Sequence, residues 1–200
     1  MKHVTLLAAV FASASFGLNA QTINSNWAPN SGFSQTYNVA NISGSISPGS
    51  TGASQSWNFA SLSSDSVYTE TYGSPAAAPG GSSFPTSTVA SQWTDGSIQS
   101  NNFYLVSSSL MQVVGSFTTT SFGNITISFS DPMDYLRFPC NLNDAYVDSF
   151  YSSINATTGL SFQQNGRNSV TVDGSGSLTT PVGTFTNVLR VKSVEEYTNF

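Results

Sequence analysis

Short segments in which apolar and polar residues alternate recur along most of the chain after residue 20. They are rich in Thr, Val, Tyr and Phe, and Gly, Asn, Asp or Pro separates one from the next. Such alternation predicts strands with one buried and one wet face, as in antiparallel sheets. No stretch keeps the i, i+3, i+4, i+7 spacing of an amphipathic helix. The predicted strands cover residues 67–72, 102–106, 110–114, 125–129, 146–151, 159–162, 169–172 and 187–194.

Proline and glycine predict loops at 43–55 and 73–85, and the serines at 107–109 predict a bend between two strands. Asp173-Gly174 and Val182-Gly183 predict two tight turns. We therefore expect one all-β domain over residues 21–200. A curved, open antiparallel sheet of meander type is the first expectation, because the segments follow one another through short turns. A two-layer β-sandwich is the alternative.

Residues 1–20 have the pattern of a secretion signal. Lys2 and His3 precede an uncharged, mostly apolar stretch at 4–18, and Ala20 ends a small-residue cleavage pattern. The stretch is shorter than the ~20 residues that cross a bilayer. We expect cleavage after Ala20, no membrane span, and a protein that is secreted or lies on the outer cell surface.

Charged residues make up 8% of the chain, against about 25% in ordinary globular proteins. Ser, Thr, Asn, Gln and Gly take their place, so the expected surface is solvated by hydroxyls and amides. After residue 20 the chain has ten acidic and only four basic residues. This excess of negative charge argues against binding to nucleic acids and to anionic membranes.

The only histidine is His3, inside the expected signal, and the only cysteine is Cys140. A chain of this kind has no Ser-His-Asp triad, no Cys-His pair and no ordinary zinc site. One cysteine forms no internal disulfide, and its apolar neighbours predict a small buried hydrophobe. We therefore expect no catalytic residues and no cofactor.

The best candidates for a metal site are four acidic residues, Asp131, Asp134, Asp144 and Asp148. Oxygen ligands at loop ends suit calcium, which is abundant outside cells. Turn chemistry is the alternative, since Asp before Pro starts a turn and Asp caps loops by bonding its own backbone. The spacing is not that of an EF-hand, and turn chemistry is the favoured interpretation.

Large aromatic residues either stack on a ligand such as a sugar or fill a core. Trp57 has apolar neighbours and is assigned to the core. Trp27 and Trp93 have polar neighbours, so they remain candidate ligand-binding residues together with Tyr135, and Tyr104 belongs to the same aromatic set. A strongly curved sheet also encloses space for an apolar ligand. The residues expected to line such a space are Phe103, Leu105, Val113, Phe129 and Phe150.

Three segments resemble motifs of secreted Bacteroidota proteins. They are QSWNF at 55–59, FPCNLNDAYVD at 138–148 and VDGSGSLTTPVGTFTNVLRV at 172–191, the last being the most specific. Proteins of this kind usually carry a C-terminal sorting domain for type IX secretion and have no assigned activity. This chain stops at Phe200 without such a domain. The resemblance implies secretion, and leaves open whether the chain is the N-terminal part of a longer protein or uses another route.

The sequence favours a secreted, non-catalytic β domain that acts as an adhesion or binding module for a glycan or a surface protein. The alternative is a carrier of an apolar small molecule in a cavity of the curved sheet. A hydrolase that uses carboxylates alone is the second alternative. The first two differ in whether the apolar strand faces close on one another or leave a space.

Overall fold

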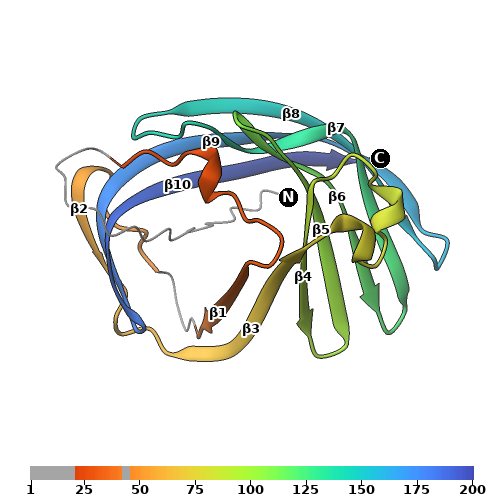
Figure 1. The fold of residues 1–200 in the computed structure, drawn as a ribbon, viewed down its shortest axis with the longest axis horizontal. Coiled ribbons are helices and arrows are strands. Elements are labelled where there is room, and N and C mark those ends of the chain that lie inside the picture. The colour runs from red at the N-terminus through yellow and green to blue at the C-terminus, as the bar shows by residue number, and fades with distance from the viewer. Residues whose placement is uncertain (1–20, 42–45) are drawn as a thin grey trace.

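A computed structural model describes residues 21–41 and 46–200, so the expected signal at 1–20 lies outside the described residues. The fold is all-β (Figure 1). Helical structure in the described part is limited to three turns of 3-10 helix, η1 (Ser25–Trp27), η2 (Pro75–Ala77) and η3 (Gly81–Ser83). None of the helices in the described ranges is long and apolar enough to cross a membrane. The strands are β1 (Ser34–Ala40), β2 (Gly52–Asn58), β3 (Ser64–Gly73), β4 (Val89–Asp95), β5 (Ile98–Val106), β6 (Leu110–Thr120), β7 (Gly123–Arg137), β8 (Ala145–Ala156), β9 (Ser161–Thr180) and β10 (Gly183–Asn199).

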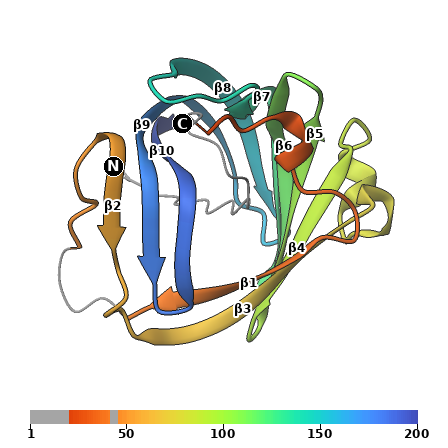
Figure 2. The ribbon, with the colours of Figure 1, turned by 60° about the vertical axis from the view of Figure 1, so that its left-hand side comes forward.

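All ten strands belong to one sheet, which confirms the curved open sheet and rules out the sandwich alternative. The order is β1-β3-β4-β5-β6-β7-β8-β9-β10, so from β3 onward each strand pairs antiparallel with the next, as a meander does. The sheet is mixed rather than purely antiparallel, because β2 leaves this path and pairs parallel with β9. Figure 2 shows β1 and β3 crossing opposite the ends of β9 and β10, so the curvature brings the two sides of the sheet toward each other.

Apart from residues 159 and 160, the predicted strand segments lie within strands, and the predicted bend at 107–109 joins β5 to β6. The N–H of Ser107 donates to the carbonyl of Leu110 at 2.8 Å and closes this bend. Strands β1, β2 and β4 were not predicted, and the loop predicted at 43–55 is wrong over residues 52–55, which belong to β2. The sequences of these strands are rich in Ser, Gln, Thr and Asn, so apolar alternation gives little signal there.

The predicted turn at Asp173-Gly174 is wrong. Strand β9 runs from Ser161 to Thr180 and merges the two short strands expected at 159–162 and 169–172. Gly174 instead allows a close approach, because a Cβ there would lie 2.7 Å from the indole Cζ2 of Trp57. The turn at Val182-Gly183 is confirmed, since it joins β9 to β10.

The predicted turn at Asp131-Pro132 is also wrong, because both residues lie inside β7. The register of β7 against β8 shifts between Phe129 and Asp131, which marks a β-bulge. Proline is tolerated at a bulge because its missing N–H breaks no ladder bond there. A bulge also bends its strand, which contributes to the curvature of the sheet.

The sheet buries apolar side chains on both faces. On the concave face, the N-terminal residues Ile23 and Ala28 pack with Tyr104, Leu136 and other residues of the largest core cluster. Cys140 belongs to this cluster with 3% of its surface exposed, as predicted for a small buried hydrophobe, and burial raises the pKa of its thiol to about 11.

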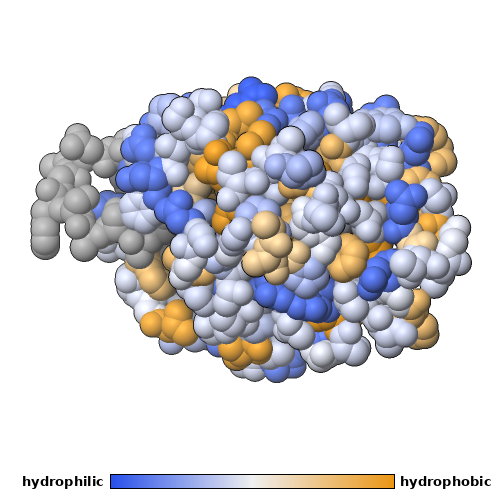
Figure 3. All heavy atoms as spheres, turned by 45° about the vertical axis from the view of Figure 1, so that its right-hand side comes forward, coloured by the Kyte–Doolittle hydropathy of each residue, from blue (hydrophilic) through white to orange (hydrophobic). Residues whose placement is uncertain are grey.

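On the convex face, Phe84 from the segment after η3 covers Phe103, Ala90 and Val114. Figure 2 shows the helical turns η2 and η3, which precede Phe84, outside β4 and β5. A third cluster joins Trp57 of β2 to Leu178 and Val188. Figure 3 shows one face of the molecule, on which polar side chains dominate and apolar ones are scattered.

Candidate ligand-binding cavity

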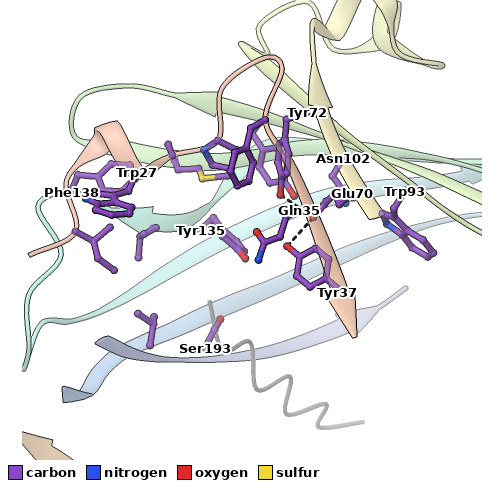
Figure 4. Close-up of a pocket in the computed structure, with 18 of the residues that line it drawn as sticks. Trp27, Gln35, Tyr37, Glu70, Tyr72, Trp93, Asn102, Tyr135, Phe138 and Ser193 are labelled. Atoms are coloured by element: carbon purple, nitrogen blue, oxygen red, sulfur yellow. Dashed lines mark hydrogen bonds between the residues drawn. The ribbon is translucent and has the colours of Figure 1, made fainter. Parts of the chain in front are cut away.

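The concave face of the sheet holds a cavity of about 300 Å³. Its walls come from β1, β3, β4, β5, β6, β7 and β10 and from the chain before β1. The first and last strands of the sheet order both line it, so the curvature of the whole sheet creates the space (Figure 4). The concave face is therefore not filled completely by its own side chains.

Aromatic rings dominate this cavity. Tyr37 of β1 stacks on Tyr68 of β3 with ring centroids 4.9 Å apart, and Tyr68 contacts Trp93 of β4 at 5.7 Å. On the other side, Tyr104 meets Tyr135 edge to face at 6.2 Å. Nine lining residues are aromatic: Trp27, Phe33, Tyr37, Tyr68, Tyr72, Trp93, Tyr104, Tyr135 and Phe138.

The pleat of two neighbouring strands explains how these side chains come together. Tyr68, Glu70 and Tyr72 are two residues apart on β3, so they share one face of the sheet. In the antiparallel register, Tyr37 lies opposite Tyr68, and Gln35 lies opposite Glu70. All five therefore face the cavity, while the residues between them face outward.

Glu70 is the only charged side chain among the described residues that line the cavity. It is 8% exposed. Its Oε2 accepts one hydrogen bond from the hydroxyl of Tyr72 at 2.9 Å and another from the hydroxyl of Tyr37 at 3.1 Å (Figure 4). Hydrogen bonds to an ionised acceptor are stronger than neutral ones, so the two phenols hold the carboxylate in place.

The environment of the cavity raises the pKa of its phenols. Burial is the largest cause for Tyr37 and Tyr72, and the negative charge of Glu70 adds to it. Burial likewise raises the pKa of Tyr104. Burial, followed by the charge of Glu70, raises the pKa of Tyr135 to about 12. At neutral pH these hydroxyl groups therefore remain protonated and available as donors.

We expect the folded protein to lose stability above pH 10. A phenol with a raised pKa in the folded state stabilises that state fully below the ordinary tyrosine pKa of about 10, and loses this contribution as the pH rises toward its folded pKa. Tyr37, Tyr72, Tyr104 and Tyr135 all act in this direction. Tyrosinate absorbance and circular dichroism, followed together against pH, measure the effect. The cavity tyrosines should ionise together with unfolding; independent ionisation of all tyrosines near pH 10 in a folded protein would contradict this.

Trp27, Trp93 and Tyr135, the residues singled out as candidate ligand-binding residues, all line the cavity, and Tyr104 joins them. Trp57 of β2 is buried against Leu178 and Val188, as expected for a core residue.

The expected lining residues are placed differently. None of Phe103, Leu105, Val113, Phe129 and Phe150 lines the cavity. Phe103 and Leu105 pack on the opposite face, Val113 packs against the main core cluster, and Phe129 packs against Phe150. For Phe103 and Leu105 the cause is simple, because β5 turns Tyr104 rather than Phe103 toward the concave side.

Three of the four acids proposed for calcium, Asp134, Asp144 and Asp148, bond to the protein itself. Asp134 accepts from Gln112 Nε2 at 2.9 Å and forms an ion pair with Arg137 at 2.8 Å. Asp148 accepts from the backbone N–H of Asp134 at 2.8 Å, and burial raises the pKa of its carboxyl group.

The other two acids are placed differently. Asp144 accepts from the backbone N–H of Asn141 at 2.7 Å, which is the loop chemistry expected of Asp. Asp131 is exposed on the bulge of β7. Among the described residues, no group of three or more His, Cys, Asp or Glu side chains could hold a metal ion.

Sequence reasoning missed Glu70, Tyr37, Tyr68 and Tyr72 as site residues. The spacing Tyr68-x-Glu70-x-Tyr72 contains the missing signal. If the two tyrosines of a strand face inward, a glutamate between them at period two must face inward as well. An inward carboxylate on an aromatic face is unusual enough to mark a site.

Comparison of the chain with protein-family models, with curated proteins and with solved structures found no match. The functional assignment therefore rests on the geometry and chemistry of the cavity.

Proposed function

We propose that this chain is a secreted, non-catalytic binding protein that holds a small, largely apolar ligand in its concave cavity. The observation that carries the proposal is the space of about 300 Å³ lined by nine aromatic residues. Small-molecule sites are typically concave and largely apolar, of roughly 300–1,000 Å³, with a few polar groups that orient the ligand. Glu70, Asn102 and Ser193 supply such polar groups.

The placement of the candidate rings supports a carrier over an adhesion module. Adhesion is served best by recognition residues that project from the surface, whereas Trp27, Trp93 and Tyr135 are half-buried and line the concave cavity. The single carboxylate of the described lining also supports binding rather than hydrolysis. Glycoside hydrolysis uses two carboxyl groups on either side of the bond, and Glu70 has no acidic partner among the described cavity residues.

The test is to fill the cavity from one strand. Gln35→Trp places a large ring opposite Glu70, inside the cavity. Thr36→Trp is the matched control, because Thr36 is the next residue of β1 and is exposed on the other face. The purified protein is titrated with N-phenyl-1-naphthylamine, an uncharged aromatic dye, and the emission of the directly excited dye is recorded.

We expect saturable binding to the unmodified protein and to Thr36→Trp. Gln35→Trp should bind about tenfold more weakly or not at all, a difference of about 1.4 kcal/mol or more. Lack of saturable binding to the unmodified protein would overturn the proposal, as would equal affinity of the two tryptophan variants.

A further inference from the structure

The carboxylate of Glu70 is only partly satisfied by the protein. An ionised carboxylate has about four acceptor positions on its two oxygens. Both hydrogen bonds formed by the described residues fall on Oε2, from Tyr37 and Tyr72. Burying a carboxylate is costly unless it is paired or fully hydrogen-bonded. Glu70 therefore lies in the cavity wall with acceptor capacity left for a ligand.

The basic side chains of the described chain all lie outside the cavity. Arg137 pairs with Asp134 and Arg190 with Asp173, with nitrogen–oxygen distances of 2.8 and 2.6 Å. Arg167 pairs with Glu196 at 2.5 Å. Lys192 is exposed and lies between Val191 and Ser193, which both line the cavity, so the pleat of β10 turns it to the opposite face. Within the described part of the chain, no cation balances Glu70 in the cavity.

The rings around Glu70 are also suited to a cation. A positive group over the face of Trp or Tyr is attracted by the ring quadrupole, and this attraction grows when water is excluded. Tyr37, Tyr68 and Trp93 form a continuous run of ring contacts beside the carboxylate. Tyr72 and Tyr104 add two further rings to the lining of the cavity. An anion in this cavity would instead face the charge of Glu70 and the negative ring faces.

We propose that the ligand carries a positively charged nitrogen, a quaternary or protonated amine attached to an apolar body, which pairs with Glu70 among the tyrosine and tryptophan rings. This inference rests on the proposed binding function and names the chemical class of the ligand. The raised pKa of Tyr37 and Tyr72 supports it, because both phenols remain neutral donors that hold the carboxylate in position.

The test uses two probes of nearly identical shape. Benzyltrimethylammonium is a cation, and neopentylbenzene is its neutral carbon isostere. Each competes with N-phenyl-1-naphthylamine for the purified protein. Three proteins are compared: the unmodified chain, Glu70→Gln, and Glu196→Gln as a control that removes one negative charge outside the cavity, where Glu196 pairs with Arg167. Circular dichroism verifies that each variant is folded.

We expect the unmodified protein and Glu196→Gln to prefer the cation by about tenfold or more. Glu70→Gln should lose that preference while still binding the neutral dye. Equal binding of the two probes to the unmodified protein would overturn the inference and leave the proposed function intact. A cation preference that survives in Glu70→Gln would also overturn it. If the dye itself does not bind the unmodified protein, the proposed function and this inference both fail.

Discussion

Replacing Phe103 with alanine is expected to lower the free energy of unfolding by about 3–5 kcal/mol, the usual cost of removing a fully buried aromatic ring. Phe103 has 0% of its surface exposed and stacks on Phe84 with ring centroids 4.3 Å apart. Ala90 and Val114 complete the cluster on the convex face. These small or branched neighbours collapse poorly into the space, so most of the cavity penalty should remain. Denaturant unfolding followed by circular dichroism measures the loss.

Val147→Ala is the matched control on the sheet surface. Val147 is 62% exposed, so its truncation should change stability by less than about 0.5 kcal/mol. Phe103→Ala should also retain dye affinity under conditions in which it is folded, because Phe103 lies on the face opposite the cavity. A loss below about 1 kcal/mol would show that the segment carrying Phe84 does not cover this face.

Replacing Trp57 with alanine is expected to have a comparable effect, about 3–5 kcal/mol. Trp57 is 5% exposed and is the main side chain by which β2 packs on Leu178 and Val188. Its indole N–H donates to the carbonyl of Ser50 at 3.1 Å, and the guanidinium of Arg190 lies 5.3 Å from the ring centroid. Removing the ring should release β2 from β9, which hydrogen exchange of the β2 amides would detect.

Trp57→Phe separates the ring from its hydrogen bond. This variant keeps an aromatic ring beside Gly174 and loses the bond to Ser50, so we expect a smaller cost of about 1–3 kcal/mol. Because Trp57 does not line the cavity, both variants should bind the dye like the unmodified protein when folded. Equal losses for the two substitutions, with no change in exchange of β2, would contradict the anchoring role.

The fold class followed from local patterns. Alternation over 125–129 and 146–151 predicts strands because a half-buried sheet requires period two, and β7 and β8 contain these segments. Short connections with turn residues predict sequential pairing, which the order from β3 to β10 confirms. Local patterns do not predict the parallel pairing of β2 with β9, because it joins residues about 120 positions apart. The side chain that packs β2 in place there is a single buried tryptophan, Trp57.

Individual residues of the cavity could be predicted from the sequence, but the way in which they come together could not. Polar neighbours singled out Trp27 and Trp93, since a large ring in a polar setting is unlike a core residue. Nothing local distinguished Tyr104 from Phe103 as the cavity-facing residue of β5. That choice depends on which face of β5 is covered by the segment that carries Phe84. Phe84 precedes β4, so it does not belong to the local sequence of β5.

Local patterns suffice to predict the all-β class, the long meander, and the burial of Trp57 and Cys140, because period-two alternation, turn residues and apolar neighbours act over a few residues. The tertiary structure is needed to bring the first and last strands of the sheet order to one space, to place Tyr37, Glu70 and Tyr72 together there, and to bond Asp134, Asp144 and Asp148 to the protein itself. Curvature accumulates from bulges and twist over the whole sheet, so the position of a cavity depends on long-range register rather than on any short stretch of sequence.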